Sequence, residues 1–585
     1  MHKLNRLAAI VLGCLLTLGL SSCSKSEDEG EISRAMSGLP AAGSLLAYVP
    51  ADTPYLLANL EPPPDDVQDI LEKHADTMLR AYQKLVRAVV AENAAELSSD
   101  GDDERAEQLL AVANPIADLM TLDGLRGAGI GRESTMVFYG AGLLPVLRVA
   151  LTDGELFEQA LERIEADAGE AMETDSVDGH SYRFAGDEKG RVVLAVMGDD
   201  LVISLVPTAG GDDILRSVLG LTLPASSIAA TDTLAELQRE YDFTPYYMGY
   251  VDVTRIAEVF LEEQHGGNAV LLREMGYDPA TKSDVCKAEI RQVAAIMPRL
   301  VTGYREFSEE RFVSNTVLEL RDDIAADLTT LTAPVPGLGQ PQSGLLAFGM
   351  SLNVLGAREF YAARLDAMEK DPFECEHFAE LQAGVSKGRA VLDQPVPPVV
   401  YDFKGFLAVI EEIEGLDLAS ERPPTSMDLW LLLAMDNVQN LIAMGSMFSP
   451  ELAALDLQPN GEIVALQHPM LEATVGTAFA AMTNAALAIS MGEGMEANLP
   501  GALEGSPSDP SPFFSTEMDA SRYYSFMAEV MAMEAPEGED APSPETKAAL
   551  QDVMNGLAQV LERIRVDVHF TERGIEMPSV ATLKE

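Results

Sequence analysis

The chain is poor in basic residues, and this shortage excludes one broad class of function. Its 585 residues include 40 lysines and arginines against 94 aspartates and glutamates, for a net charge of −54. A surface of this sign repels phosphate backbones, so we expect no nucleic-acid partner. Apolar residues make up 47% and charged residues 23% of the chain, which is typical of a globular body.

The spacings of known catalytic and metal sites are also missing. The sequence contains no H-E-x-x-H, G-x-S-x-G, phosphate-binding loop or C-x-x-C motif. His377 follows Cys375 by two residues, but side chains two apart point to different sides of a helix, so we predict no metal there. No cofactor or metal is therefore predicted, although an enzyme whose site is assembled from distant residues stays open.

The N-terminus lacks a hydrophobic run long enough to span a bilayer, yet it has the parts of a signal peptide. Lys3 and Arg6 precede the apolar stretch 7–20, and two serines stand directly before Cys23. The Leu-Ser-Ser-Cys sequence resembles the lipobox of bacterial lipoproteins. This resemblance implies a signal peptide over 1–22, lipidation of Cys23 and attachment to a membrane through that lipid. Ser24 in place of aspartate implies delivery to the outer membrane, facing the periplasm.

Cysteine is scarce, and the few copies can be assigned by elimination. Cys14 leaves with the signal peptide and Cys23 carries the lipid, so Cys286 and Cys375 remain. In an oxidising compartment two such thiols favour a disulfide, and a pair of unlinked buried cysteines is the alternative.

The body after residue 43 predicts an α+β fold in two lobes, because helical and strand-like periodicities alternate along it. Residues 23–43 read as a flexible tether, 44–331 as the first lobe, 332–344 as a Pro/Gly linker and 345–585 as the second lobe. The predicted elements include a helix over 67–90, hairpins over 135–151, 192–206 and 299–320, strands over 44–49, 565–570 and 574–582, and helices over 475–491 and 544–564.

Two features suggest that the lobes are diverged copies of one helix-plus-hairpin unit. Residues 344–348 (Gly-Leu-Leu-Ala-Phe) echo residues 44–48 (Ser-Leu-Leu-Ala-Tyr), and both lobes end on a strand pair. The lipobox, this opening and the repeated hairpins together resemble large envelope lipoproteins of Gram-negative bacteria. That resemblance implies an envelope location and no particular activity.

Methionines crowd part of the second lobe, and they leave two functional hypotheses open. They either fill a core or line a groove for a lipid or another apolar ligand. The predicted groove residues are Met427, Met435, Met444, Met447, Met482 and Met491. We expect a non-catalytic binding or assembly role with an envelope protein partner, and a carrier of an apolar ligand is the alternative.

Overall fold

The computed structural model describes residues 44–99, 101–169, 171–186, 189–415, 426–447, 457–466, 477–532 and 542–584. The predicted signal peptide, the tether and Cys23 lie outside these ranges. The described chain divides into two compact units. Unit 1 holds 44–294, 298–314 and 542–556, whereas unit 2 holds 295–297, 315–541 and 557–584, including the predicted linker 332–344.

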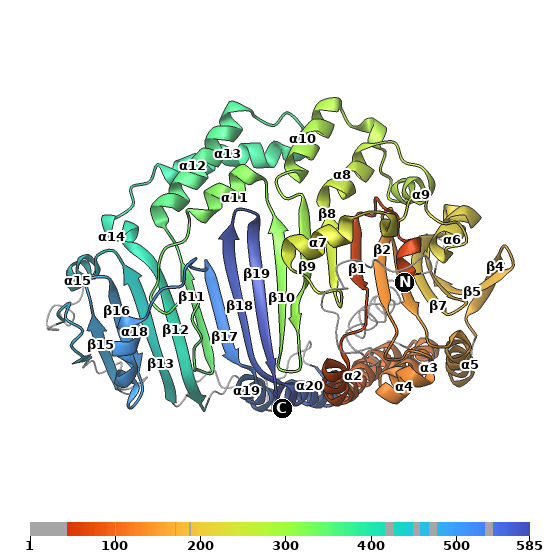
Figure 1. Cartoon of the computed structure of the whole chain (residues 1–585), viewed down its shortest axis with the longest axis horizontal. Helices are drawn as coiled ribbons and strands as arrows, with labels where there is room; N and C mark the ends of the chain where they lie inside the picture. Colours follow the sequence, from red (N-terminus) through yellow and green to blue (C-terminus); the bar gives the residue numbers. More distant parts are fainter. Residues whose placement is uncertain are drawn as a thin grey trace, which may run out of the picture. The chain divides into compact units, whose positions relative to one another are not determined.

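Unit 1 is an antiparallel sheet with helices in the connections between its strands (Figure 1). Its strands are β1 (Tyr55–Asn59), β2 (Met136–Ala141), β3 (Leu144–Ala150), β4 (Glu173–Val177), β5 (His180–Gly186), β6 (Gly190–Met197), β7 (Asp200–Pro207), β8 (Met248–Asp252) and β9 (Arg299–Phe307), and the chain passes into unit 2 within β10 (Arg311–Glu319). Its helices are η1 (Leu45–Tyr48), α2 (Asp65–Ser99), α3 (Asp103–Leu119), α4 (Leu122–Gly127), α5 (Gly154–Ala168), α6 (Gly211–Leu219), α7 (Thr233–Tyr241), α8 (Val253–Leu261), α9 (Gly266–Glu274), α10 (Asp284–Ala294), and most of α20 (Pro544–Val560).

The helix α20 joins unit 1 although it lies far along the chain from α2. The Glu92 carboxylate on α2 accepts hydrogen bonds from the Thr546 hydroxyl at 2.5 Å and the Ser543 N–H at 3.3 Å. Lys84 forms an ion pair with Asp552 at 2.7 Å. These contacts place the start of α20 along α2.

The strands of unit 2 are also antiparallel. Its strands are β11 (Leu346–Ser351), β12 (Phe403–Glu414), β13 (Ser426–Met435), β14 (Val464–Ala465), β15 (Ala478–Met482), β16 (Ala486–Met491), β17 (Phe514–Asp519), β18 (Leu561–Thr571), β19 (Gly574–Leu583) and the end of β10. Its helices are α11 (Asp322–Thr329), α12 (Val354–Lys370), α13 (Ala379–Leu392), α14 (Pro398–Tyr401), α15 (Val438–Ser446), α18 (Leu499–Glu504) and α19 (Ala520–Ala532). The predicted α+β class is confirmed.

The strands of the two units follow the same order. In unit 1 the order is β5-β6-β7-β3-β2-β1-β8-β9, with β4 added beside β5. In unit 2 the order is β14-β15-β16-β13-β12-β11-β17-β18-β19. The final strand of the first copy, β10, pairs with β9 as β19 pairs with β18. The chain therefore folds as two repeats, the first from η1 to β10 and the second from the segment before β11 to β19.

The strand register aligns individual residues of the repeats. The central strand residue Leu56 pairs with Tyr250 in β8, and Ala347 pairs with Glu517 in β17. Matching Leu56 with Ala347 therefore places Tyr250 on Glu517. Two residues later, the same match places the helix-capping Asp252 on Asp519.

The sequence echo between residues 44–48 and 344–348 does not mark equivalent positions. The first segment forms η1, where a strand was predicted, and the second leads into β11. The counterpart of η1 is the turn from Val335 to Leu338. In both places a main-chain N–H donates to a carbonyl three residues earlier at 3.2 Å, from Val49 to Leu46 and from Leu338 to Val335.

The predicted helix over 475–491 is wrong, because the described part of this stretch, 477–491, contains the hairpin of β15 and β16. Its small apolar residues fit a strand that is buried on both faces as well as they fit a helix. Strand pairing with β13 decides between them, and periodicity alone cannot reveal that pairing.

Candidate functional site

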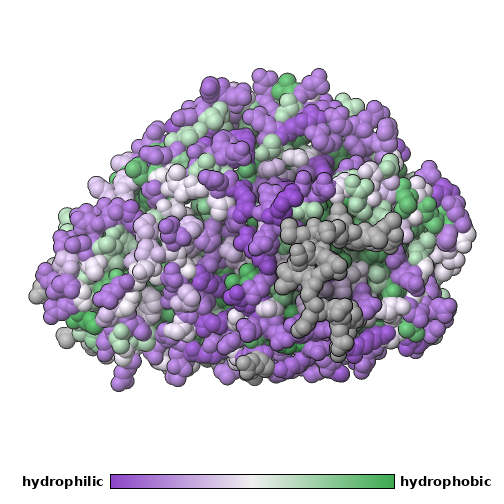
Figure 2. All heavy atoms as spheres, in the orientation of Figure 1, coloured by the Kyte–Doolittle hydropathy of each residue, from purple (hydrophilic) through white to green (hydrophobic). Residues whose placement is uncertain are grey.

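A line of charged side chains crosses β17, β18 and β19 on one face of the unit 2 sheet. The cross-strand pairs are Glu517 with Arg565, Ser515 with Asp567, Asp519 with Arg563 and His569 with Glu576. Cross-strand partners share a face, so these residues form one surface, which we call the charged face. Hydrophilic residues gather over the middle of these strands in Figure 2.

The charged face holds the predicted Pro/Gly linker through its main chain. The Glu517 carboxylate, whose side chain is 8% exposed, accepts the Gln342 N–H at 2.9 Å and pairs with Arg563 at 2.9 Å. Arg563 also donates to the Gln342 carbonyl. We call residues 339–342 the strap.

A second arginine fixes the beginning of the strap. Arg565 donates to the carbonyl of Gly339 and to Asp567 at 2.9 Å, and the Ser515 hydroxyl donates to Asp567 at 2.6 Å. Gly339 has φ +76°, and a Cβ there would meet the Ser508 hydroxyl at 2.6 Å, so this position requires glycine.

Apolar packing anchors the chain just before the strap. Val335 and Leu338 are fully buried against Leu407, Leu432 and Trp430 in a core cluster on the same sheet face. The linker between the predicted lobes is therefore a docked segment of unit 2, with an apolar half up to Leu338 and a polar half in the strap.

The other end of the charged face surrounds Glu576. Its carboxylate accepts hydrogen bonds from Thr571 at 2.9 Å, Arg573 at 2.9 Å and the Asn315 amide at 3.3 Å. Burial raises the pKa of Glu576, but these hydrogen bonds outweigh it and hold the pKa below 4.5. The carboxylate is therefore kept ionised inside the protein.

His569 lies across from Glu576 and is half-buried. Burial lowers the pKa of its imidazole, although the carboxylates of Asp567 and Glu576 oppose that shift. Among the residues that the structure describes, none forms a hydrogen bond with its Nδ1. The imidazole is thus biased toward the neutral form, in which one ring nitrogen can donate and the other accept.

The first repeat keeps some charges of the charged face and has neutral residues in place of others. Register places Asp252 on Asp519 and Arg299 on Arg563, so these two charges are kept. Tyr250 occupies the position of Glu517. Its cross-strand partner Val301 therefore occupies the position of Arg565, the partner of Glu517. Gly303 likewise occupies the position of Asp567. Because the same fold forms with Tyr250, Val301 and Gly303, the charges of Glu517, Arg565 and Asp567 are not a requirement of the architecture.

Unit 1 carries a buried charged pair on two of its own strands, β3 and β7. The Arg148 side chain is fully buried, lies 3.7 Å from Asp200, donates to the Val218 carbonyl at 3.1 Å, and stacks on the Tyr48 ring. Burial raises the pKa of Asp200, which Arg148 partly offsets. In unit 2 register places Leu432 at the position of Arg148. The buried arginine of unit 1 thus has an apolar counterpart in unit 2.

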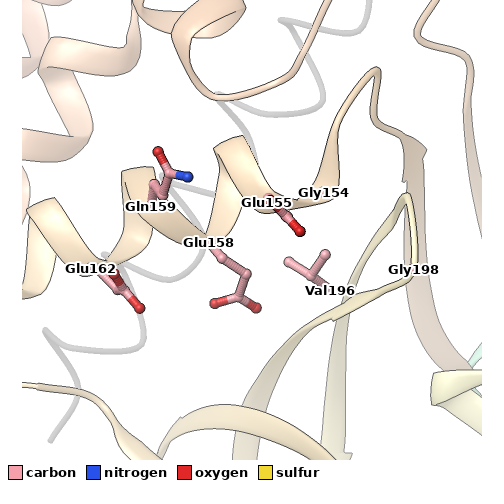
Figure 3. A pocket seen from close by; sticks show the side chains of 7 residues that line it. All are labelled: Gly154, Glu155, Glu158, Gln159, Glu162, Val196 and Gly198. Atoms are coloured by element: carbon pink, nitrogen blue, oxygen red, sulfur yellow. The ribbon is translucent and has the colours of Figure 1, made fainter.

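Unit 1 also has an open depression of about 350 Å³ beside α5 (Figure 3). Glu155, Glu158 and Glu162 line it from the helix, and Gly198 lines it from the turn between β6 and β7. Glu158 forms an ion pair with Arg183 at 2.7 Å. The depression is shallow and lined by acidic side chains. Acidic side chains are abundant throughout this chain, so they do not mark the depression as a site.

Of the predicted site residues, the two late cysteines are brought together. Cys286 on α10 and Cys375 before α13 form the predicted disulfide, and both are buried.

The predicted methionine groove residues are dispersed. Met435 and Met482 pack in one core cluster with Val438. Met427 and Met491 are half-buried strand residues, whereas Met444 and Met447 at the end of α15 are 37% and 80% exposed. The structure therefore brings two of the six together.

The charged face was missed in the sequence, although a signal for it exists. Residues 563–570 read Arg-Ile-Arg-Val-Asp-Val-His-Phe, in which charged and apolar residues alternate strictly. This is the period of a strand with one polar face. The predicted helix over 544–564 hid this alternation, because it included the first residues of β18. In the structure α20 ends at Val560.

Within the described residues, no group of three or more His, Cys, Asp or Glu side chains could hold a metal ion. In the same residues, no helix combines the length and hydropathy needed to cross a membrane. No protein-family model, curated protein or solved structure matches the chain.

Proposed function

We propose that this protein is a lipid-anchored envelope lipoprotein with a non-catalytic binding or assembly role on the periplasmic side of the outer membrane. The anchor rests on the Leu-Ser-Ser-Cys sequence at residues 20–23. The Cys286–Cys375 disulfide supports an oxidising compartment, because disulfides persist outside the cytosol.

The binding role rests chiefly on the charged face of unit 2. Paired charges in partly buried positions contribute little net stability, and an apolar replacement is often as stable. The first repeat supplies such a replacement for the Arg565–Asp567 pair, with Val301 and Gly303 at these positions, and Tyr250 takes the place of Glu517. We infer that the charges are kept for recognition.

A carrier of an apolar ligand is the second candidate. Met444 and Met447 are the observation that favours it, since both expose flexible apolar side chains on α15. The packing of Met435 and Met482 in a core supports the view that these two fill space. Solvent extraction of the purified protein, followed by mass spectrometry, tests this candidate. Lipid at near-stoichiometric amount supports a carrier, and its lack leaves the binding role.

The anchor is tested by fractionating cells that express Cys23→Ala. We expect the wild type in the membrane pellet and the variant in the soluble fraction. Cys14→Ala is the matched control, because Cys14 lies inside the apolar stretch of the signal peptide and should leave the pellet unchanged. A variant lacking Cys23 that still pellets with membranes would contradict the proposal.

The binding role is tested by chemical cross-linking in intact cells followed by purification of the full chain. We expect one or a few envelope proteins to be captured in defined ratio by the wild type and lost in Glu517→Gln. Equal capture by both chains would remove the charged face from the proposal.

A further inference from the structure

We propose that the charged face of unit 2 binds the main chain of an extended peptide, and that the strap occupies this site in the free protein. The inference rests on the proposed binding function and names the class of its partner. The observation behind it is how the strap is held.

Charged side chains hold both main-chain groups of a single strap residue. The Glu517 carboxylate accepts the Gln342 N–H at 2.9 Å, and Arg563 donates to the Gln342 carbonyl. Arg565 holds the carbonyl of Gly339. An N–H and a carbonyl are present in almost every residue of any peptide, so this pattern recognises an extended chain with little regard to its side chains.

The side chains of the strap contribute little to this attachment. Gln340 and Pro341 are exposed, although the Gln340 amide donates to the Ser508 hydroxyl at 3.1 Å. The Gln342 amide donates to the carbonyls of Gly337 and Gln340, which belong to the same segment. A foreign peptide could therefore replace each main-chain hydrogen bond of the strap with one of its own.

The chain next to the strap is suited to let it leave. The fully buried Val335 and Leu338 keep the preceding turn on the core. Gly337 and Gly339 have φ of +74° and +76°, and glycine reaches many other conformations at no steric cost. The strap can thus detach after Gly339 while its apolar anchor stays in place.

The first repeat attaches its equivalent segment differently. The Tyr250 hydroxyl donates to the Thr53 carbonyl at 3.3 Å. Arg255 donates to the same carbonyl at 2.8 Å and to the Ala51 carbonyl at 3.3 Å. In unit 2 a carboxylate occupies the position of Tyr250, which adds an acceptor for a main-chain N–H. The first repeat therefore binds carbonyls only through these side chains, whereas unit 2 binds both the N–H and the carbonyl of one residue.

Tethering gives the strap an effective concentration on the order of millimolar, so it competes strongly with a free peptide. Weakening the strap should therefore reveal the site. Gln342→Pro removes the N–H that Glu517 accepts. The probe is a blocked synthetic peptide of residues 338–344, Leu-Gly-Gln-Pro-Gln-Ser-Gly. Its binding to the full-length protein is measured by fluorescence anisotropy.

We expect Gln342→Pro to bind this peptide at least tenfold more tightly than the wild type. Adding Glu517→Gln should reverse the gain, because the peptide uses the same carboxylate. Ser343→Ala is the matched control at the exposed position directly after the strap and should bind as the wild type does. Equal affinities of Gln342→Pro and the wild type would overturn the proposal.

A second measurement uses the unmodified protein and does not depend on a variant that folds. Saturating peptide should accelerate hydrogen exchange of the Gln342 amide, because the strap is displaced. Unchanged exchange at saturation would contradict the proposal even if the peptide binds. If the peptide does not bind but envelope proteins are still cross-linked, the proposal of an extended peptide as partner is wrong. The proposed binding function would then stand.

Discussion

Asp252 and Asp519 occupy the same position in two copies of one fold. Each is the last residue of a strand and caps the helix that follows, accepting the main-chain N–H of Arg255 at 2.9 Å and of Arg522 at 3.0 Å. The surrounding sequences are Asp-Val-Thr-Arg and Asp-Ala-Ser-Arg. This shared motif is the clearest sequence trace of the duplication.

Replacing either capping aspartate by alanine should destabilise the protein by a similar amount. The lost cap leaves a main-chain N–H unpaired, which costs about 1 kcal/mol of unfolding free energy. Urea denaturation of Asp252→Ala and Asp519→Ala measures it. Asparagine at either position also caps a helix and should restore most of the loss. A cost in one repeat alone would show that the two positions are not energetically equivalent.

Arg148→Ala should be among the most destabilising single changes in unit 1. It leaves Asp200 and the Val218 carbonyl without their buried partner, at a cost of about 3–5 kcal/mol. The double variant Arg148→Leu with Asp200→Ala imitates unit 2, where register places Leu432 and Ala486. We expect it to be about 2 kcal/mol more stable than Arg148→Ala, because no charge is left unpaired. If the double variant is the less stable, the register comparison does not govern this core.

The stabilisation by Glu576 should depend on pH. Its pKa in the folded protein is lower than the ordinary 4.5, so ionisation favours the folded state above that value. The contribution is fully present near neutral pH and is lost as the pH falls through the lowered pKa. The difference in unfolding free energy between the wild type and Glu576→Gln should therefore shrink in acid. Glu572→Gln, at an exposed position of the same hairpin, is the control and should show a small difference at every pH.

Removing the disulfide should lower stability without changing the fold of either unit. Cys286 and Cys375 close a loop of roughly 90 residues, and constraining such a loop in the unfolded chain is worth about 4–5 kcal/mol in the entropy model. The double variant Cys286→Ala with Cys375→Ala avoids an unpaired thiol. Urea denaturation should show the loss, and the wild type under reducing conditions should match the variant. A midpoint unaffected by the change would mean that the bridge is energetically neutral.

Local patterns were sufficient to predict much of the fold. The hairpins over 135–151 and 192–206 were predicted correctly, because a tight turn and two strand-like arms lie within a few residues of each other. The disulfide followed from elimination among four cysteines. These predictions need only short-range information.

Long-range pairing decided what those patterns left open. The stretch 478–491 is a hairpin because its second strand pairs with β13. The strap is a docked segment because Glu517 and Arg563 lie next to each other only after β17 pairs with β18. Neither contact leaves a trace in a window of a few residues.

The sequence by itself determined the acidic charge, the predicted export signal, the α+β class and the cysteines available for a bridge, because each depends on composition or on neighbours in the chain. The tertiary structure alone decided that the two repeats share a strand order and that Glu517, Arg563 and Arg565 form one face. The physical reason is that a sheet brings residues together through register between strands, and register is fixed by the packing of the whole fold.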